Sequence, residues 1–238
     1  MAGHSKWANI KHKKAKQDAQ RGKVFTRLTK EITVAAREGG GDPDGNSKLR
    51  LLIDKAKYVN MPNENINRAI KKGTGELAGA SYEFITYEGY GPGGMALIVT
   101  VLTDNKNRTV SALRHVFSKC SGNLAESGAV MWMFDQRGVL VVKANGKTED
   151  DVLESLLDYN VYDVKKNEDI ITVICLQEDL EVVKKALEEA GFVVDSADLS
   201  WIAKNPVKVS SENEDKAFKL LEAIDDLDDV QDTYANLE

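Results

Sequence analysis

The basic residues near the N-terminus are the part of this sequence best suited to binding chemistry. From Lys6 to Arg37 the chain carries ten lysines and arginines against two acidic residues. Such side chains neutralise phosphates and release the counterions condensed on a nucleic acid. Trp7 and His12 lie among them, and aromatic rings stack on unpaired bases. The predicted contact residues are Lys6, Trp7, Lys11, His12, Lys13, Lys14, Lys16, Arg21, Lys23, Arg27 and Lys30.

Two features of these candidates leave alternatives open. Trp7 is also suited to be the single core anchor of an otherwise polar first helix. A second phosphate patch is predicted at Arg108 and Thr109, which open a helix that also presents Arg114. The N-terminus of a helix attracts phosphate, but an ordinary N-cap turn explains the same residues.

Catalytic and metal chemistry have little support in the sequence. The three histidines share no helical face, and neither Cys-x-x-Cys nor His-Glu-x-x-His occurs, so we expect no zinc site. Cys120 and His115 stand five residues apart on one predicted helix and point to different faces, which argues against a nucleophilic dyad. We therefore predict no catalytic residue, no metal and no cofactor; an enzyme would need a cluster of perturbed acids that one sequence does not reveal.

Two further motifs have simple structural interpretations. Gly89 to Gly94 matches G-x-G-x-x-G, but the loop leads into a second strand rather than a helix, and Pro92 lacks an amide donor. We predict a strand–strand connection whose glycines adopt positive φ. The acidic turn, defined as Asp225, Asp226, Asp228 and Asp229, lacks the glycine and final glutamate of an EF-hand loop and predicts a solvated helix end.

Charge divides the chain into two parts. Residues 1–75 contain 17 Lys+Arg and 7 Asp+Glu, a net of +10, whereas the remainder contains 15 and 31, a net of −16. A basic N-terminal part on an acidic body predicts a polyanionic partner for the basic part. The 42% hydrophobic and 29% charged composition is ordinary for a globular protein and excludes a disordered or collagen-like chain.

The sequence also limits the compartment in which the protein works. No apolar run approaches the ~20 residues that a membrane-spanning helix needs, and the basic N-terminus lacks the apolar core of a secretory signal. Only two cysteines, Cys120 and Cys175, occur, and no motif joins them. We expect two free thiols in a reducing cytoplasm.

The apolar periodicity predicts the order of the elements. Residues 1–75 form a small helical bundle, with Gly73 just past the end of its last helix. Strands over 82–88 and 95–102 and a helix over 107–121 follow, and 131–134 is a short strand. A βαββαβ unit then spans 138–202, which is ferredoxin-like. Its first helix, 149–158, has a capping box at Thr148 and Asp151 and turns Val152, Leu153, Leu156 and Leu157 inward.

A helix over 213–225 and a terminal strand are too short to form a domain alone. We predict that they complete the sheet begun at 82–121. The predicted fold class is α+β: an N-terminal helical bundle followed by two ferredoxin-like α/β domains, the third inserted into the second. The predicted boundaries are 1–79, then 80–135 plus 206–238, with 136–205 inserted.

Several long segments resemble one known family. The N-terminal block MAGHSKWANIKHKKAKQDAQRGKVFTRLTKEITVAAREGGGDPDGNSKLRLLIDKA is similar to the YebC family. So are NMPNENINRAIKKGTG, YEGYGPGG, LTDNKNRTVSALRHVFSK and GNLAESGAV. The resemblance spans the chain and is densest in the first 135 residues.

The resemblance implies three domains: a helical N-terminal bundle, then two α/β domains around a cavity, with the third inserted in the second. It implies no established catalytic residues. It maps the family's basic N-terminal positions onto Lys6, Lys11, Lys13, Lys14, Lys16, Arg21 and Lys23. The family is described as probable DNA-binding transcriptional regulators, but its mitochondrial relative activates translation of cytochrome c oxidase subunit I.

We therefore expect a non-enzymatic, nucleic-acid-binding regulator of gene expression in the cytoplasm, with no small-molecule substrate and no membrane contact. The first form of this hypothesis is a DNA-binding transcriptional regulator. The alternative is a ribosome-associated translation factor that binds ribosomal RNA or tRNA and relieves stalling. The N-terminal part shows no clear base-reading helix-turn-helix, which favours RNA slightly.

Overall fold

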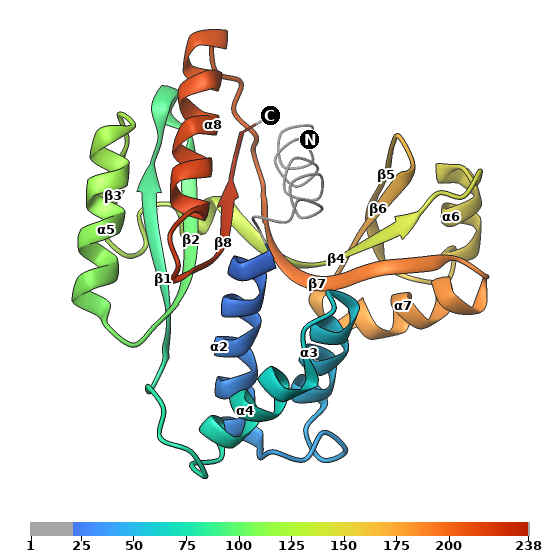
Figure 1. Ribbon diagram of the computed structural model, residues 1–238. Helices are drawn as coiled ribbons and strands as arrows, with labels where there is room; N and C mark the ends of the chain where they lie inside the picture. The colour runs from blue at the N-terminus through green and yellow to red at the C-terminus, as the bar shows by residue number, and fades with distance from the viewer. Residues whose placement is uncertain (1–20, 238) are drawn as a thin grey trace. The chain divides into compact units, whose positions relative to one another are not determined.

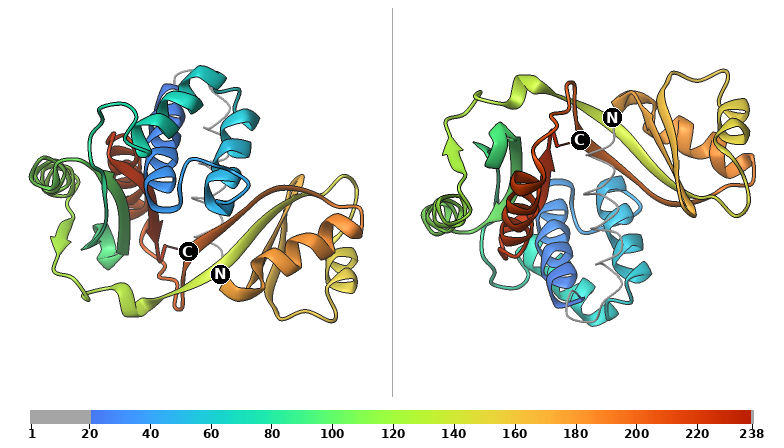
Figure 2. Two further views of the ribbon diagram at one scale, coloured as in Figure 1. Left: turned by 90° about the horizontal axis from the view of Figure 1, so that it is seen from below. Right: turned by 90° about the horizontal axis from the view of Figure 1, so that it is seen from above.

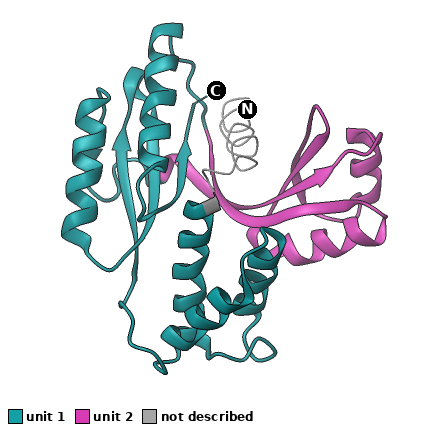
Figure 3. Ribbon diagram, in the orientation of Figure 1, with its two compact units in different colours: residues 1–131, 205–238 teal, residues 132–204 magenta. Residues whose placement is uncertain are grey.

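The computed structural model describes residues 21–237. The chain divides into two compact units (Figure 3), and one of them is continuous in sequence. The split unit comprises residues 1–131 and 205–238, and the inserted unit comprises residues 132–204. Within residues 21–237, no helix combines the length and apolar character needed to cross a bilayer.

The first described helices of the split unit form a bundle with its own core. They are α2 (Arg21–Gly39), α3 (Ser47–Tyr58) and α4 (Asn63–Gly73). Their buried apolar side chains include Ile32 of α2, Leu49 of α3 and Ile66 of α4. Asn46 joins two of the helices, because it caps α3 at the amide of Leu49 and donates to the carbonyl of Ala35 in α2 at 2.8 Å.

A four-stranded sheet with the order β3-β1-β2-β8 forms the rest of the split unit (Figure 1). Every neighbouring pair is antiparallel, and β1 and β2 form a central hairpin. The elements of this part are β1 (Glu83–Tyr90), β2 (Ala96–Thr103), α5 (Lys106–Lys119), β3 (Asn123–Ala125), α8 (Ser211–Asp225) and β8 (Val230–Ala235).

Both helices of this part pack on one face of the sheet. Alternate β2 residues Leu97, Val99 and Val101 share a core with Phe117 of α5 and Leu220 of α8. Side chains alternate between the faces of a strand, so this shared core places α5 and α8 on the same side. The C-terminal segment 206–237 therefore completes a sheet that begins more than a hundred residues earlier.

The glycine-rich loop links two strands, as the sequence predicts. Residues Pro92–Gly94 form a short 3-10 turn between β1 and β2. Gly93 and Gly94 have φ of 74° and 80°, which side chains disfavour. At Gly93 a Cβ would also lie 2.7 Å from Val209. The glycines serve a tight connection rather than a dinucleotide.

The inserted unit has a second four-stranded sheet, with the order β5-β6-β4-β7. Its helices complete a βαββαβ order (Figure 2). Sequential hairpin strands β5 and β6 lie together, and β4 lies between β6 and β7, which is the ferredoxin-like arrangement. The elements are β4 (Phe134–Lys143), α6 (Glu149–Ser155), β5 (Val161–Asn167), β6 (Ile170–Cys175), η4 (Gln177–Asp179), α7 (Leu180–Glu189) and β7 (Val193–Ala203).

Helix α6 confirms one local prediction and corrects another. The capping box between Thr148 and Asp151 is present in both directions. The helix, however, ends at Ser155 rather than at residue 158, and only Val152 and Leu156 are buried. Leu153 is 44% exposed and Leu157 is 79% exposed, so the prediction that both face inward is wrong. Two leucines per turn exceed what one face of a short helix can bury.

Residues 131–134 also differ from the prediction. Met131–Met133 form a 3-10 turn, and β4 begins at Phe134, four residues before the predicted strand. The reason is long-range pairing, because Phe134 to Arg137 pair with residues 203 to 200 of β7. The fold class is confirmed: N-terminal helices precede two antiparallel sheets. The three domain boundaries stay a prediction.

Candidate nucleic-acid interface

Most of the predicted nucleic-acid contacts precede the described residues. Arg21 is the first residue of α2, and Lys23, Arg27 and Lys30 follow in the same helix. The predicted residues that lie outside the described part of the chain are Lys6, Trp7, Lys11, His12, Lys13, Lys14 and Lys16.

Three cations of α2 have acidic partners in the same unit. Lys23, Arg27 and Lys30 stand at i, i+4 and i+7, so they share one helical face. That face meets the acidic turn after α8: Lys23 pairs with Asp226, and Arg27 lies 3.1 Å from Asp225 Oδ1. Arg27 also donates to the Asp225 carbonyl at 2.8 Å. These cations join α2 to the sheet, and their contact with nucleic acid stays a prediction.

Lys30 makes the most buried of these pairs. Its ammonium lies 2.7 Å from Asp229 Oδ1 and 2.9 Å from the carbonyl oxygen of Asp228. Lys30 is 7% exposed and Asp229 is 8% exposed. A buried charge without a partner is costly, but each of these has several. The two residues therefore form an internal ion pair, not a solvated surface pair.

Asp229 accepts hydrogen bonds from side chains on three other elements. We call Asp229 and these donor residues the Asp229 cluster. Arg108 of α5 lies 3.0 Å from Asp229 Oδ2 and 2.8 Å from Asp104. The hydroxyl oxygens of Thr109 and Thr103 lie 2.7 Å and 3.1 Å from the same Oδ2. The members of the Asp229 cluster are Lys30, Thr103, Arg108, Thr109 and Asp229.

The cluster changes the acidity of its central carboxyl. Burial alone would raise the pKa of Asp229, but hydrogen bonds from Lys30, Thr109 and Arg108 outweigh it and lower the pKa to about 2. Asp229 is therefore ionised at any physiological pH. The hydrogen bonds that Arg108 donates to Asp229 and Asp104 raise the pKa of its guanidinium.

The prediction of a solvated acidic turn is wrong at Asp229. The sequence contains a signal that would have found the contact: three cations at i, i+4 and i+7 in α2 and four acids within 225–229 have complementary charge. The structure also shows partners within the protein for the second predicted phosphate patch, at Arg108 and Thr109. Asn105 caps α5 through the amide of Arg108 at 3.0 Å, and Thr109 is buried, so these residues form an ordinary helix start tied to the cluster.

Another buried carboxylate holds a loop rather than a ligand. Glu88 of β1 is 3% exposed and accepts bonds from the amides of Gly128, Val130 and Met131 at 2.6, 2.7 and 2.8 Å. Burial raises the pKa of this carboxyl, and the three amides overcome that effect and lower it. Within residues 21–237, no group of three or more His, Cys, Asp or Glu side chains is arranged to hold a metal.

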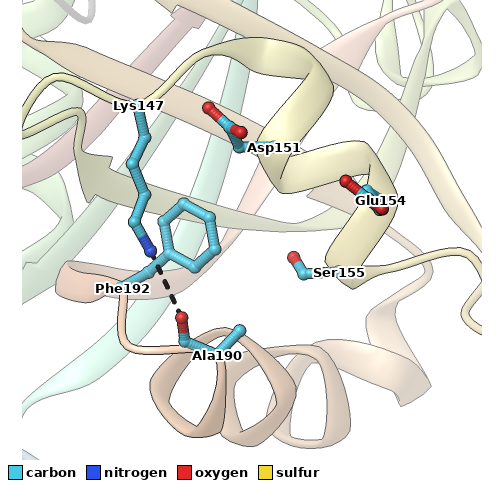
Figure 4. A pocket seen from close by; sticks show the side chains of 6 residues that line it. All are labelled: Lys147, Asp151, Glu154, Ser155, Ala190 and Phe192. Carbon is cyan, nitrogen blue, oxygen red and sulfur yellow. Dashed lines mark hydrogen bonds between the residues drawn. The ribbon is translucent and has the colours of Figure 1, made fainter.

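A hollow in the inserted unit lies between α6 and the C-terminal end of α7 (Figure 4). Lys147 extends over the Phe192 ring, with its ammonium 3.7 Å from the ring centroid, and donates to the Ala190 carbonyl at 3.2 Å. The protein's own lysine thus already occupies the Phe192 ring face and the Ala190 carbonyl of this hollow. The lining residues are Lys147, Asp151, Glu154, Ser155, Ala190 and Phe192.

The fold and the charges define an α+β protein in which the basic helix α2 forms ion pairs with the acidic turn of the same protein. A family model for the TACO1/YebC protein N-terminal domain matches residues 5–76. A model for the TACO1/YebC second and third domain matches residues 82–237. The chain belongs to the TACO1/YebC family.

Relatives support this assignment over the full length. A protein from Halothermothrix orenii is 53% identical over 241 residues, covers 100% of this chain and 95% of its own length, and is named a probable transcriptional regulatory protein. A Chlorobaculum tepidum relative with the same description is 53% identical over 239 residues, with coverage of 100% and 95%. A crystal structure of a conserved hypothetical protein from Aquifex aeolicus matches with a TM-score of 0.85 and 45% identity, covering 93% of this chain and 91% of that one.

Proposed function

We propose that this protein is a non-enzymatic regulator of gene expression that binds nucleic acid through its basic segment, defined as residues 6–16. The observation that carries the proposal is charge: the segment contains five lysines and no acidic residue. Lysines at this density bind phosphate and release counterions. The names of the relatives, probable transcriptional regulatory proteins, agree with a regulatory role.

We give a complementary role to α2. Lys23, Arg27 and Lys30 are engaged by the protein's own carboxylates. The proposal therefore gives phosphate contact to the lysines that precede α2 and makes α2 the connection between the basic segment and the sheet. The acidic remainder of the chain repels bare phosphate, which concentrates binding in the basic segment.

Two nucleic acids fit this chemistry. A transcriptional regulator would bind DNA, as the relatives' names suggest. A translation factor would bind ribosomal RNA or tRNA on the ribosome, and the placement of Trp7 and His12 among the lysines favours this candidate because aromatic rings stack on unpaired bases. Either activity is cytoplasmic, where the free thiols Cys120 and Cys175 persist.

A double variant tests the basic segment. Lys13→Ala with Lys14→Ala should weaken binding to both duplex DNA and single-stranded RNA of mixed sequence, with the logarithmic salt slope falling by about one unit per lost contact. The matched control, Lys184→Ala with Lys185→Ala in α7, removes the same charge from the inserted unit and should leave binding unchanged. Equal affinities for the wild type and the Lys13/Lys14 variant would remove the basic segment from the interface.

A further inference from the structure

Helix α5 is basic, whereas the part of the split unit that contains the sheet is acidic. Segments 80–131 and 205–238 together contain 14 Asp+Glu and seven Lys+Arg. Four of those seven cations lie on α5, Lys106, Arg108, Arg114 and Lys119, and the helix has no acidic residue. A single helix thus concentrates most of the positive charge of an otherwise acidic region.

The orientation of α5 distinguishes Arg108, which is paired within the protein, from the other cations of the helix. Thr109, Leu113 and Phe117 are buried against the sheet, and Arg108 belongs to the Asp229 cluster. The opposite face is exposed, and α5 lies at the outer edge of the split unit in all three views (Figures 1 and 2). The exposed residues on or flanking this outer face are Asn107, Ser111, Arg114, His115, Ser118 and Lys119.

Arg114 and Lys119 have no ion-pair or hydrogen-bond partner among residues 21–237. They differ in this from Lys23, Arg27, Lys30 and Arg108, each of which is paired with a carboxylate. Asn107, Ser111, Arg114 and Ser118 follow one another at intervals of three or four residues, so they form a continuous stripe. At a rise of 1.5 Å per residue the stripe is about 16 Å long.

We propose that this face of α5 is a second phosphate-binding surface, which contacts the backbone of the nucleic acid bound by the basic segment. The inference rests on the proposed function and extends it to the middle of the chain. Arginine, lysine, serine and asparagine are the side chains that protein–nucleic acid complexes use on phosphate oxygens. Because the stripe offers no carboxylate and only short polar side chains beside Arg114, with Lys119 flanking it, a phosphate chain can approach it closely.

The same face lacks what a protein partner would require. Protein interfaces depend on buried aromatic or aliphatic anchors at their centre. The large hydrophobic side chains that are exposed in residues 21–237 include none from α5. A surface of small polar groups and cations without such an anchor favours a sugar–phosphate backbone over an acidic protein.

The test compares three double variants of the full chain: Arg114→Gln with Lys119→Gln in α5, Lys13→Ala with Lys14→Ala in the basic segment, and Lys184→Gln with Lys185→Gln as the charge-matched control. Affinities for mixed-sequence duplex DNA and single-stranded RNA are measured over a range of salt. We expect the α5 variant to lose on the order of tenfold in affinity per lost contact at 0.1 M salt. The slope should fall by roughly 0.9 per contact on duplex and 0.7 on single strands.

Each outcome separates this inference from the proposed function. Arg114→Lys with Lys119→Arg keeps both charges and should restore binding, which excludes a loss caused by misfolding. An α5 variant that binds like the control, while the basic-segment variant is weakened, would overturn the α5 surface and leave the proposed function intact. Wild-type affinity in both variants would contradict the proposed function itself.

Discussion

The ammonium of Lys30 and the carboxylate of Asp229 lie 2.7 Å apart across 199 positions of sequence. This contact joins the first described helix to the turn that leads into the last strand. It means that Lys30 of α2 and Asp229 of the acidic turn, which the sequence presents on separate charged segments, neutralise one another inside the protein. The cations that remain for a polyanion lie elsewhere.

Asp229→Ala should destabilise the protein by about 3–5 kcal/mol, because it leaves the buried Lys30 ammonium without its carboxylate. Urea unfolding gives the free energy of unfolding. Asp228→Ala is the matched control: its carboxylate is exposed, and we expect a change of about 0.5 kcal/mol or less. Equal losses in the two variants would show that the Lys30–Asp229 pair contributes nothing specific.

Acid should release the Asp229 cluster in a defined window. The pKa of Asp229 is about 2 in the folded protein against 3.8 ordinarily, so its contribution is complete above about pH 4 and is lost as the pH falls toward about 2. The shift corresponds to about 2 kcal/mol of stability. A carboxyl NMR titration of Asp229 measures this directly, and a midpoint near its ordinary value would contradict the cluster's electrostatics.

Glu88→Gln should loosen the loop that follows β3. The carboxylate accepts from three backbone amides, and a glutamine side chain keeps only one acceptor oxygen, so we expect a loss of about 1–3 kcal/mol. Proteolysis within 126–131 should become faster. Glu83→Gln, at the exposed start of β1, is the control. Unchanged protection of the loop in Glu88→Gln would show that the amides find other partners.

Local sequence patterns account for much of the fold. The capping box at Thr148 and Asp151 and the positive φ of Gly93 and Gly94 depend on residues close together in the chain, and both were predictable. The early start of β4 at Phe134 was not, because its first residues are ordered by pairing with β7 some seventy positions later. Leu153 and Leu157 were misassigned because hydrophobicity alone does not show how much of a short helix the core can cover.

Only the positive charge of the candidate site could be predicted from the sequence. The sequence locates the cations but not their partners, since the ion pairs of Lys23, Arg27 and Lys30 each join residues about two hundred positions apart. Arg108 illustrates the difference: its place at the start of a helix predicts phosphate contact, and the fold adds an ion pair with Asp229 that the sequence does not reveal. Its contact with nucleic acid stays a prediction. Arg114, six residues later, is exposed and is the stronger candidate, because it lies outside the buried face of α5.

Ultraviolet crosslinking in growing cells, followed by sequencing of both the DNA and the RNA recovered with the protein, tests the central claim most directly. The account predicts nucleic-acid reads well above an untagged strain, a marked loss in the Lys13→Ala, Lys14→Ala variant and retention in the Lys184→Ala, Lys185→Ala control. Reads at promoters would identify a transcriptional regulator, and reads on ribosomal RNA or tRNA a translation factor. Recovery no greater than in the untagged strain would contradict nucleic-acid binding as the function of this protein.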